Sequence, residues 1–403
     1  MSEGRPSASV ADVTQILAQH YNLQVLSITE LVSFDSRNFA VEAVPLKKKL
    51  HRKAEHDDEA ENDSPSRQNS DCCGSKEKCN PLTVPAQKLV LKILNSELCR
   101  EEKLFTTKQQ IEASRFLKRE GFLCPEVIVT SEHELLAPTN ISESCALLMT
   151  MLPGTALGSD KNRLTATVLY ELGVLLASMH QVLSGCNNKY METDPHNPWA
   201  MENMHLLSDY LDCIEDEDDK KMLADVMAQF QRIRNNELPL LIKSLIHGDF
   251  HDLNLIVDWD STNLDTERST ICQKYGIIDF EEMSVSYPAL ELGRLIADMM
   301  TDCDSLNLLD IGGHVLAGYF SVDEYVVKNF SLYQAVLACL AQYMVLGSYE
   351  YTAQGGTNDY CSLGSKESKK VLKQLRDVDE SEVYKAWGDV LAQYGVKNVF
   401  SQE

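Results

Sequence analysis

The sequence predicts an α+β protein with two lobes, a small N-terminal lobe built on an antiparallel sheet and a large, mostly helical C-terminal lobe. Two observations predict this division. Short strand-like runs dominate residues 10–151, whereas residues 152–398 carry long segments with helical spacing of apolar residues. Between them lies LPG at Leu152 to Gly154, and Pro followed by Gly ends a strand and turns the chain. We therefore expect the boundary between the lobes at residues 151 and 152.

The composition limits the classes of function. The chain has 403 residues, of which 44% are hydrophobic, enough for a two-lobed protein with a sizeable core. Its net charge of -24 argues against nucleic acid or an anionic membrane as the main partner, because both bind basic surfaces. The same charge favours a small cationic substrate. The sequence indicates no oligomeric state.

The cysteines and the N-terminus predict a cytoplasmic protein. None of the 12 cysteines forms a CxxC pair or the ligand spacing of a zinc site, so reduced thiols are expected. The first ten residues contain no apolar segment typical of a signal peptide. The most apolar helical segment, Leu332 to Leu346, contains two glutamines and is too short to span a bilayer, so we interpret it as a buried helix.

The N-terminal lobe begins with a predicted helix from Val13 to Tyr21, which follows Asp12 as a candidate cap. A strand from Val25 to Leu31, a polar turn and the strand FAVEAV follow. Residues 46–82 are basic, then acidic, then rich in Ser, Asn, Cys and Pro, so they predict a disordered insertion between two strands. Two further strands are predicted at Lys88 to Leu94 and at Cys145 to Met151.

The C-terminal lobe is predicted to be mainly helical from Leu164 onward, because apolar residues recur there with helical spacing. The predicted helices cover Ala166 to Leu183, Met201 to Tyr210, Lys220 to Asn235, Glu291 to Thr301 and Ser331 to Tyr349.

Two short segments in this lobe carry the chemistry, HGDFHDLN at His247 to Asn254 and YGIIDFEE at Tyr275 to Glu282. Phosphoryl transfer from a nucleoside triphosphate needs one carboxylate that orients or deprotonates the acceptor hydroxyl, and oxygen ligands that hold Mg²⁺. Asp249, Asn254 and Asp279 supply such groups. The apolar runs that follow Asn254 and precede Asp279 predict a two-stranded ribbon, with a polar, turn-rich stretch between its strands. Such a ribbon brings Asn254 and Asp279 to one end.

The combination of HGDxxxxN, a strand, a loop and IDF resembles the aminoglycoside phosphotransferase and choline kinase superfamily. The related protein-kinase pattern is H-R-D-x-x-x-x-N followed by D-F-G, whereas this chain has Gly248 in place of Arg and Glu281 in place of the final Gly. The resemblance implies a bilobal protein-kinase-like fold. It also implies that Asp249 is the catalytic base and that Asn254 and Asp279 bind Mg²⁺.

The same resemblance assigns the phosphate donor, GTP or ATP, to the N-terminal lobe. Lys92 projects from its strand opposite to its apolar neighbours and matches the phosphate-binding lysine of the superfamily. The polar turn at Ser33 to Phe39 contains no glycine, but Ser33 and Asn38 can offer hydroxyl, amide and backbone N–H groups to phosphate; an ordinary hairpin turn is the alternative. The main chain of Met149 and Met151 is expected to contact the base.

Two further acidic residues have a role that the resemblance defines less well. The helix predicted at Phe105 to Arg119 offers Glu112 as the acid that pairs with Lys92, although Gln109 and Gln110 stand where such an acid is expected. Glu291 stands where many aminoglycoside kinases have a second Asp, and we expect it to cap or brace a helix.

Five segments are similar to the hydroxylysine kinases, a subfamily of this superfamily; they are HGDFHDLNLI, GIIDFEEMSVSYPALELG, SFDSRNF, MTMLPG and above all IGGHVLAGY at Ile311 to Tyr319. The resemblance covers nearly the whole chain except the insertion and both ends. It implies GTP-dependent phosphorylation of the side-chain hydroxyl of 5-hydroxy-L-lysine in the cytoplasm. The substrate is then a small cationic amino acid.

Other acceptors and another class of protein stay open. Choline, ethanolamine or an aminoglycoside are alternatives; choline requires an aromatic cage, for which the candidates are Trp199, Tyr287 and Tyr349. Hydroxylysine requires carboxylates for its ammonium groups and a cation or donor for its carboxylate, for which the candidates are Asp252, Glu282, Glu350 and His314. A nucleotide-binding pseudokinase is the third alternative, against which the intact Asp249, Asn254, Asp279 and Lys92 argue.

Overall fold

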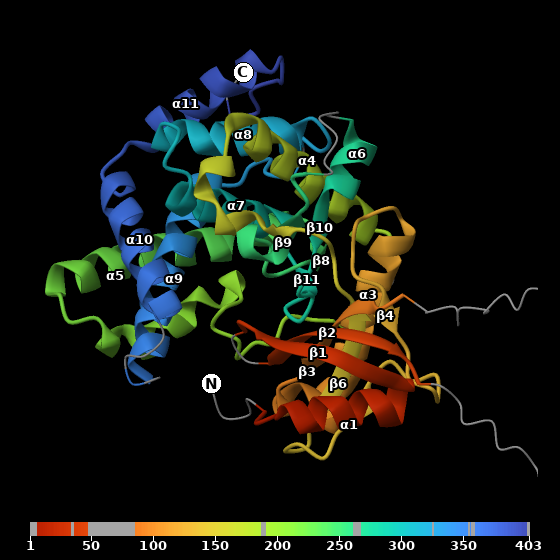
Figure 1. The fold of residues 1–403 in the computed structure, drawn as a ribbon. Coiled ribbons are helices and arrows are strands. Elements are labelled where there is room, and N and C mark those ends of the chain that lie inside the picture. Colours follow the sequence, from red (N-terminus) through yellow and green to blue (C-terminus); the bar gives the residue numbers. More distant parts are fainter. Residues whose placement is uncertain are drawn as a thin grey trace, which may run out of the picture. The chain divides into compact units, whose positions relative to one another are not determined.

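The computed structural model describes residues 6–33, 36–46, 85–186, 191–260, 267–324, 326–353, 355 and 359–400. The chain forms two compact units, Met1–Ser96 with Ile128–Thr150 and Glu97–Val127 with Met151–Glu403 (Figure 1). Nearly all of the predicted insertion at 46–82 lies outside the described residues.

The division differs from the predicted one at residues 97–127 and at Met151, which begins the long second segment of the second unit. Residues 97–127 were expected in the N-terminal lobe, but they belong to the second unit. The reason is packing and hydrogen bonding, since Leu117 and Phe122 lie in the core of the second unit. The Leu123 N–H donates to Cys272 O at 2.9 Å, and the Leu123 carbonyl accepts from Ile277 N at 2.8 Å.

The first unit is built on one sheet with the strand order β1-β2-β3-β6-β4. Strand β5 also pairs with β6. The strands that pair with a described register are all antiparallel, as the sequence predicts. Helix α1 lies beside one face of this sheet (Figure 1) and buries Val13, Ile16 and Leu17 in a core shared with Phe39 and Leu91. The elements are α1 (Val10–Tyr21), β1 (Leu23–Leu31), β2 (Arg37–Pro45), β3 (Gln87–Ile93), β4 (Val127–Ile128), β5 (Ala137–Pro138) and β6 (Cys145–Thr150).

The start of α1 corrects one detail of the sequence analysis. Asp12 was expected to cap the helix, but Ser9 is the N-cap residue. The Ser9 hydroxyl accepts from the Asp12 N–H, and the Asp12 carboxylate accepts from the Ser9 N–H at 2.8 Å. This reciprocal arrangement is a capping box, which satisfies two backbone donors that the first turn leaves free.

Two small sheets in the second unit hold the chemical motifs. One has the order β10-β9-β7, and the other pairs β8 with β11. The predicted ribbon is confirmed, because Leu255 pairs with Ile277 and the Ile278 N–H donates to Asn254 O at 3.0 Å. The predicted turn-rich connection contains a helix, α6. The elements are β7 (Thr155–Ala156), β8 (Ser244–Ile246), β9 (Leu255–Val257), α6 (Arg268–Lys274), β10 (Tyr275–Ile277) and β11 (Ser284–Ser286).

The rest of the second unit is helical, as predicted, and its helices agree with the expected segments except at 201–210, which forms a 3-10 helix. The helices are α2 (Ser96–Cys99), α3 (Glu101–Arg119), α4 (Ala166–Leu183), α5 (Glu217–Asn236), α7 (Pro288–Asp302), α8 (Leu308–Phe320), α9 (Leu332–Ala353), α10 (Asp359–Leu375) and α11 (Glu380–Gln393). Short 3-10 helices are η1 (Leu157–Ser159), η2 (Lys161–Arg163), η3 (Met201–Cys213), η4 (Leu238–Leu240) and η5 (Asp252–Asn254).

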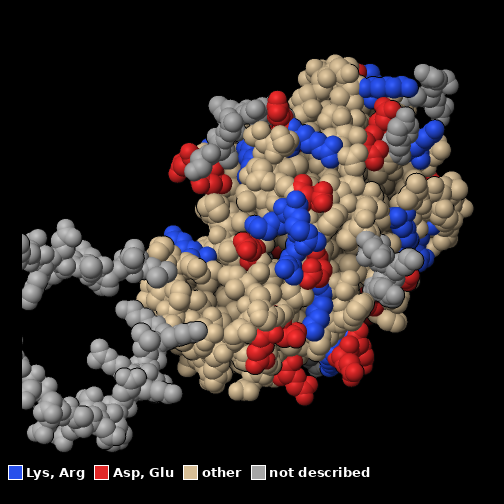
Figure 2. Space-filling model, turned by 90° about the vertical axis from the view of Figure 1, so that its right-hand side faces the viewer, with Lys and Arg blue, Asp and Glu red and all other residues tan. Residues whose placement is uncertain are grey.

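One helix, α4, is long and apolar enough to cross a membrane by length and composition alone, but 72% of it is buried inside the protein. Burial on this scale is what a core helix requires. On the face shown in Figure 2, Lys and Arg side chains lie next to Asp and Glu side chains and do not gather into one extended basic patch. The cysteines among the described residues are free thiols.

The glycines of IGGHVLAGY have a packing function. The segment lies in α8, and a Cβ on Gly318 would overlap the Tyr170 carbonyl of α4, while a Cβ on Gly173 of α4 would overlap the Val315 carbonyl of α8. The two helices therefore approach with backbone against backbone. Gly312 and Gly313 instead lie against the side chains of Trp387 and Val390 of α11.

We predict that Gly318→Ala destabilises the protein by about 1–3 kcal/mol, the usual cost of overpacking a filled core. The matched control is Gly364→Ala, also inside a helix, where an added Cβ meets nothing within 4 Å. That control should raise the free energy of unfolding by about 0.5–1 kcal/mol, because Ala is the better helix former. Urea denaturation of both variants is the measurement, and equal effects of the two substitutions would contradict the packing role.

Candidate active site

The segment His247 to Asn254 forms a tight loop between β8 and β9. Gly248 has a φ of 85°, a conformation that residues with a side chain rarely adopt. A Cβ at this position would also overlap the backbone carbonyl of Glu282. The HGD sequence therefore needs glycine at its centre, which explains why the Arg of the protein-kinase pattern is absent.

The buried carboxylate of Glu291 holds this loop in place. Its Oε1 accepts from the Gly248 N–H at 2.5 Å, and its Oε2 accepts from the His247 N–H at 3.2 Å. His180 Nε2 lies 2.7 Å from the same Oε2. Burial alone would raise the pKa of Glu291, but the contacts with His180, His247 and Gly248 outweigh it and lower the pKa. Glu291 therefore braces the catalytic loop, and it does so from the first turn of α7.

The support of Glu291 continues into the helical core. His180 of α4 places its second ring nitrogen, Nδ1, 2.7 Å from the Tyr319 hydroxyl. Tyr319 is the last residue of IGGHVLAGY, so this segment reaches the catalytic loop through two buried side chains. The helix contact at Gly173 and Gly318 sets the position of both.

His247 joins the two motif segments. Its side chain is fully buried, and Nε2 lies 3.0 Å from the carbonyl of Ile278, the residue before Asp279. Its Nδ1 accepts from the Asp249 N–H at 3.3 Å. One imidazole thus fixes the backbone at both Asp249 and Asp279.

The Asp249 carboxylate is surrounded by donors. The Asn254 amide nitrogen donates to Oδ2 at 2.8 Å and to the main-chain carbonyl at 2.9 Å. His251 Nε2 lies 3.4 Å from Oδ2, and Arg294 Nη1 lies 3.9 Å from Oδ1. Burial would raise the pKa of Asp249, but His251, Arg294 and His247 hold it well below its usual value. The side chain is 35% exposed, so an ionised carboxylate faces solvent.

His251 is itself held between carboxylates. Its Nδ1 faces Asp252 Oδ1 at 3.5 Å and the Leu253 N–H at 3.3 Å, so it accepts from the amide when neutral and donates to the carboxylate when charged. Burial opposes the charge, yet Asp249, Asp252 and Asp298 raise the pKa of His251 well above its usual value.

Asn254 and Asp279 fit a magnesium site. Because the Asn254 amide nitrogen is bonded to Asp249, its carbonyl oxygen is left to point elsewhere. Asp279 is exposed, and its backbone has a φ of 64°, an uncommon conformation that the flanking hydrogen bonds maintain. Mg²⁺ is commonly bound by one or two protein oxygens with water and phosphate completing its shell. No group of three His, Cys, Asp or Glu side chains is arranged for a metal in the described part of the chain.

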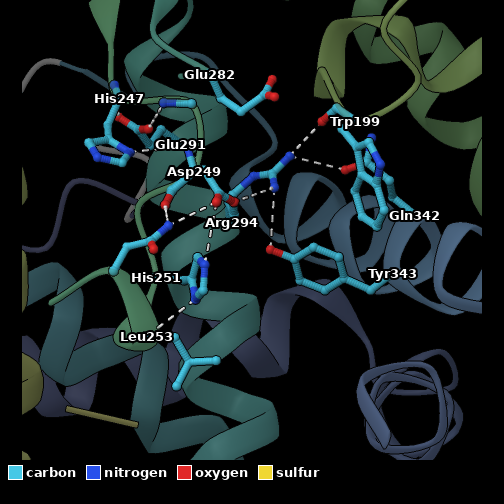
Figure 3. A network of polar contacts seen from close by, with 12 residues as sticks. Trp199, His247, Asp249, His251, Leu253, Glu282, Glu291, Arg294, Gln342 and Tyr343 are labelled. Atoms are coloured by element: carbon cyan, nitrogen blue, oxygen red, sulfur yellow. Dashed lines mark hydrogen bonds and ion pairs between the residues drawn. The ribbon is translucent and has the colours of Figure 1, made fainter. Parts of the chain in front are cut away.

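Arg294 forms the next wall of the site. It is 4% exposed and lies between Asp249 and a group formed by Trp199, Gln342 and Tyr343 (Figure 3). Its Nη2 donates to the Trp199 carbonyl at 2.7 Å and to Gln342 Oε1 at 3.2 Å, and its Nη1 lies 3.5 Å from the Tyr343 hydroxyl.

Two further carboxylates complete the surroundings of Asp249. Glu282 accepts from Asn197 Nδ2 at 2.9 Å, and loss of solvation together with the charge of Asp249 raises its pKa to about 7. Asp298 lies one helical turn beyond Arg294 and is 7% exposed. Burial raises the pKa of Asp298 to about 8 despite the opposing effects of His251, Arg294 and Tyr343.

Several predicted substrate residues lie elsewhere or act through the fold. Asp252 is 5% exposed, contacts His251 and packs where Gly158 has no side chain, so it supports the loop. His314 hydrogen-bonds to Tyr394, the residue that follows α11, at 2.9 Å and lies in a helix interface, where Asp310 is the charged group nearby. Glu350 is 2% exposed and lies near Tyr210. These three placements correct the expectation of a substrate role.

The aromatic residues proposed for a choline cage have separate neighbours. The Trp199 ring lies 6.3 Å from Tyr343, and the Tyr349 ring lies 4.8 Å from Tyr210. Tyr287 is covered by Lys243, whose Nζ is 4.8 Å from the ring centroid. No ring contact between described residues joins the three candidates, so the structure offers no cage made of them.

The predicted donor-binding residues of the first unit are arranged on neighbouring strands. Asn38 of β2 and Lys92 of β3 are register partners, so their side chains lie side by side on one face of the sheet. Lys92 is 6% exposed, and the Asn38 side-chain oxygen is buried and has no hydrogen-bond partner among the residues that the structure describes. The Ser33 hydroxyl donates to the Ser36 carbonyl at 2.7 Å. Their role, like that of the Met149 and Met151 main chain, stays a prediction.

The helix that was expected to supply an acid for Lys92 has another function in its own unit. Glu112 pairs with Arg115 on the surface of α3 at 2.7 Å. Gln110 is the buried polar residue of this helix, and its amide donates to the carbonyls of Glu281 and Met283 at 2.6 and 3.1 Å. It therefore holds the loop that follows Asp279.

Comparison with known proteins agrees with this geometry. Residues 82–325 match the model of the phosphotransferase enzyme family. The chain belongs to this family. It is 26% identical to hydroxylysine kinase from Xenopus laevis over 98% of this chain and 96% of that protein, and 25% identical to hydroxylysine kinase from Danio rerio over 96% of each.

A solved structure supports the fold of this phosphotransferase. An amicoumacin kinase in complex with AMP-PNP, Ca²⁺ and Ami aligns with a TM-score of 0.60 and 12% identity, over 93% of this chain and 97% of that one. The predicted α+β, protein-kinase-like fold with two lobes is confirmed. As a member of the family, the protein is a kinase of small molecules that acts on a hydroxyl group.

Three residues of this site in the phosphotransferase were not predicted from the sequence, namely Arg294, Asp298 and His251. A signal for the first two was present, because Glu291, Arg294 and Asp298 recur at i, i+3 and i+7 in an otherwise apolar helix. Three ionisable residues on the buried stripe of a helix indicate a polar site on that stripe. His251 stands inside the HGDFHDLN motif, between the two residues that were assigned.

We predict that the ligand-free protein loses stability as the pH rises from about 4 to about 8, in part through Asp298, whose pKa rises from 3.8 to about 8 on folding. In this window the native state holds a proton that the unfolded chain has lost. Stability should therefore fall by up to about 1.4 kcal/mol per pH unit for this group.

Asp298→Asn should reduce this slope, whereas the surface control Asp389→Asn should not. Chemical denaturation between pH 4 and pH 8 is the measurement. The groups that face Asp298 and are present in both proteins are His251, Arg294, Tyr343 and Asp252. Parallel curves for the wild type and Asp298→Asn would show that Asp298 does not titrate in this window.

Proposed function

We propose that this phosphotransferase transfers the γ-phosphoryl group of GTP, or of ATP, to the hydroxyl group of 5-hydroxy-L-lysine. The observation that supports the reaction type is an ionised Asp249 that accepts a hydrogen bond from Asn254, has the cationic side chains of His251 and Arg294 within 3.4 and 3.9 Å, and stays 35% exposed. The near full-length similarity to proteins named hydroxylysine kinase supports the acceptor. The cytoplasm is the proposed location.

In this proposal Asp249 accepts a hydrogen bond from the acceptor hydroxyl and directs its oxygen towards the γ-phosphorus. A bond forms between this oxygen and the phosphorus, and the bond from the phosphorus to the β–γ bridging oxygen breaks. The hydroxyl proton passes to Asp249, and the products are a phosphate ester and a nucleoside diphosphate. Because the transition state is loose, the proton leaves late, so a carboxylate of low pKa is basic enough.

The neighbours of Asp249 define its orientation. Asn254 binds Oδ2 and the main-chain carbonyl of Asp249, which fixes the rotation of the carboxylate. Arg294 and His251 keep it ionised, as the low pKa indicates. Fixed geometry of this kind contributes to catalysis because no reorganisation is needed when the acceptor arrives.

We propose that Asn254 Oδ1 and the Asp279 carboxylate hold Mg²⁺. When bound, this ion neutralises charge on the donor phosphates. The imidazole of His247 contacts the Asp249 N–H and the Ile278 carbonyl. It therefore fixes the main chain at Asp249 relative to the main chain next to Asp279. Ser33, Asn38, Lys92, Met149 and Met151 are the residues that we propose for the nucleotide itself.

We predict that the purified protein releases nucleoside diphosphate with 5-hydroxy-L-lysine, and does so faster with GTP than with ATP. Lysine has the same charged groups but no hydroxyl, so it should inhibit competitively and give no release. Coupled assays with each acceptor and each donor are the measurement. Faster release with choline, ethanolamine or an aminoglycoside would show that this compound, and not 5-hydroxy-L-lysine, is the acceptor. Tight nucleotide binding without release for any acceptor would indicate a pseudokinase.

We predict that Asp249→Asn lowers turnover by about 10²–10⁴-fold, the usual range for loss of a general base. The amide is isosteric, so folding and nucleotide binding should persist, as thermal shift with and without nucleotide would show. Asp389→Asn on the surface of α11 is the matched control. Turnover within a few-fold of the wild type would remove Asp249 from the mechanism.

We predict that Asp279→Ala abolishes the Mg²⁺ dependence of nucleotide affinity and that Asn254→Ala weakens it less. A carboxylate brings a full charge to the ion, whereas an amide oxygen brings a dipole. Asp258→Ala, on the same connection but in the turn after β9, is the control. Calorimetry with and without Mg²⁺ is the measurement, and an unchanged Mg²⁺ effect in Asp279→Ala would show that the ion binds elsewhere.

A further inference from the structure

Helix α7 carries Glu291, Arg294 and Asp298 on one buried stripe. Both carboxylate oxygens of Glu291 are paired with N–H groups of the catalytic loop or with His180. The charged groups of Arg294 and Asp298 are less completely paired. Asp298 Oδ2 is buried and has no hydrogen-bond partner within the described residues. The fold leaves a guanidinium and a carboxyl group, one helical turn apart, beside the catalytic loop.

The Arg294 guanidinium is held by neutral groups. Its hydrogen bonds go to the Trp199 carbonyl and to Gln342, while its distance to the Asp249 carboxylate, 3.9 Å, is too long for a hydrogen bond. A buried cation without a bonded carboxylate is costly. The planar guanidinium is also the side chain best shaped to bind a carboxylate through two parallel hydrogen bonds. An anionic group of a ligand would supply the missing partner.

Asp298 has the opposite requirement. Its carboxyl group is 7% exposed, and Tyr343 is one of its neighbours. The free Oδ2 needs a donor, and the cost of leaving such an oxygen unpaired in a buried position is about 1–3 kcal/mol or more. An ammonium group of a ligand would supply three N–H donors and a positive charge. Its arrival would also favour the ionised carboxylate.

The two groups meet at Tyr343. Arg294 Nη1 lies 3.5 Å from the Tyr343 hydroxyl, and Tyr343 is also one of the groups close enough to Asp298 to lower the pKa of its carboxyl group. Four residues of helix separate the two side chains by about 6 Å along the axis. A guanidinium and a carboxylate on either side of one hydroxyl complement a ligand whose own carboxylate and ammonium share one carbon atom.

We propose that Arg294 and Asp298 bind the α-carboxylate and the α-ammonium group of an amino-acid acceptor, and so select amino acids over simple amino alcohols. This inference rests on the proposed function, in which Asp249 receives the hydroxyl of such an acceptor. Glu282, fixed by Asn197, is left for the side-chain ammonium. A ligand without the carboxylate leaves Arg294 unmatched, and a ligand without the α-ammonium leaves Asp298 unmatched.

The test is calorimetric binding of three ligands that cannot react, namely lysine, 1,5-diaminopentane, which lacks the carboxylate, and 6-aminohexanoate, which lacks the α-ammonium. The wild type should bind lysine at least 10-fold more tightly than either analogue. Arg294→Gln should remove the preference over 1,5-diaminopentane, and Asp298→Asn should remove the preference over 6-aminohexanoate. Each substitution should leave the other preference within about threefold of the wild type.

Matched controls are Arg115→Gln and Asp389→Asn, two surface ion-pair residues on α3 and α11 that should leave both preferences unchanged. The wild-type comparison stands even where a buried variant fails to fold. Equal affinity of the wild type for all three ligands, or no binding of lysine, would overturn the proposal. Selective lysine binding without release of nucleoside diphosphate from any hydroxylated amine would reject the proposed reaction and leave this inference standing.

Discussion

The buried carboxylate of Glu291 is the constraint on which the active site depends. The loop between β8 and β9 has a backbone conformation at Gly248 that is open to few residues, and two of its N–H groups point to one spot. A single anion there satisfies both donors, as anions do in other backbone concavities. His247 extends this order to the loop of Asp279. Without Glu291, the residues of the HGD and IDF segments would be present but would not be held in fixed positions relative to one another.

The charges around Asp249 are arranged to keep one carboxylate ionised among several. Glu282 and Asp298 have raised pKa values, whereas Asp249 has a lowered one. The difference follows from the partners. His251 and Arg294 outweigh the burial of Asp249, whereas burial outweighs the effects of the same two groups on Asp298, and Glu282 accepts from the neutral amide of Asn197. Carboxylates whose environments push their pKa values apart can perform different tasks in one site.

The parts of the structure that could be predicted from sequence are those with local signals. Alternating and helical patterns predicted the α+β fold, and the motif spacing predicted the ribbon that joins Asn254 to Asp279. The parts that could not be predicted depend on packing between distant segments. His314 is polar and stands in the most distinctive segment, yet its helix turns it towards Tyr394. Residues 97–127 follow strand β3, but their apolar residues fit the core of the second unit. Arg294 and Asp298 were visible only as a polar stripe whose purpose depends on what faces it.

The anchors of the catalytic loop have a consequence for how the enzyme is made. Within the loop the contacts are local, but Glu291 is 44 positions from His247, His180 is 111 positions from Glu291, and Tyr319 is 139 positions from His180. Contacts of such long sequence separation form late, because the entropy of closing the intervening chain must be overcome first. A nascent chain that has not yet added α8 to α4 and α7 therefore has HGD in its sequence but no ordered catalytic loop. The order of this loop therefore depends on residues that the chain supplies only with α7 and α8.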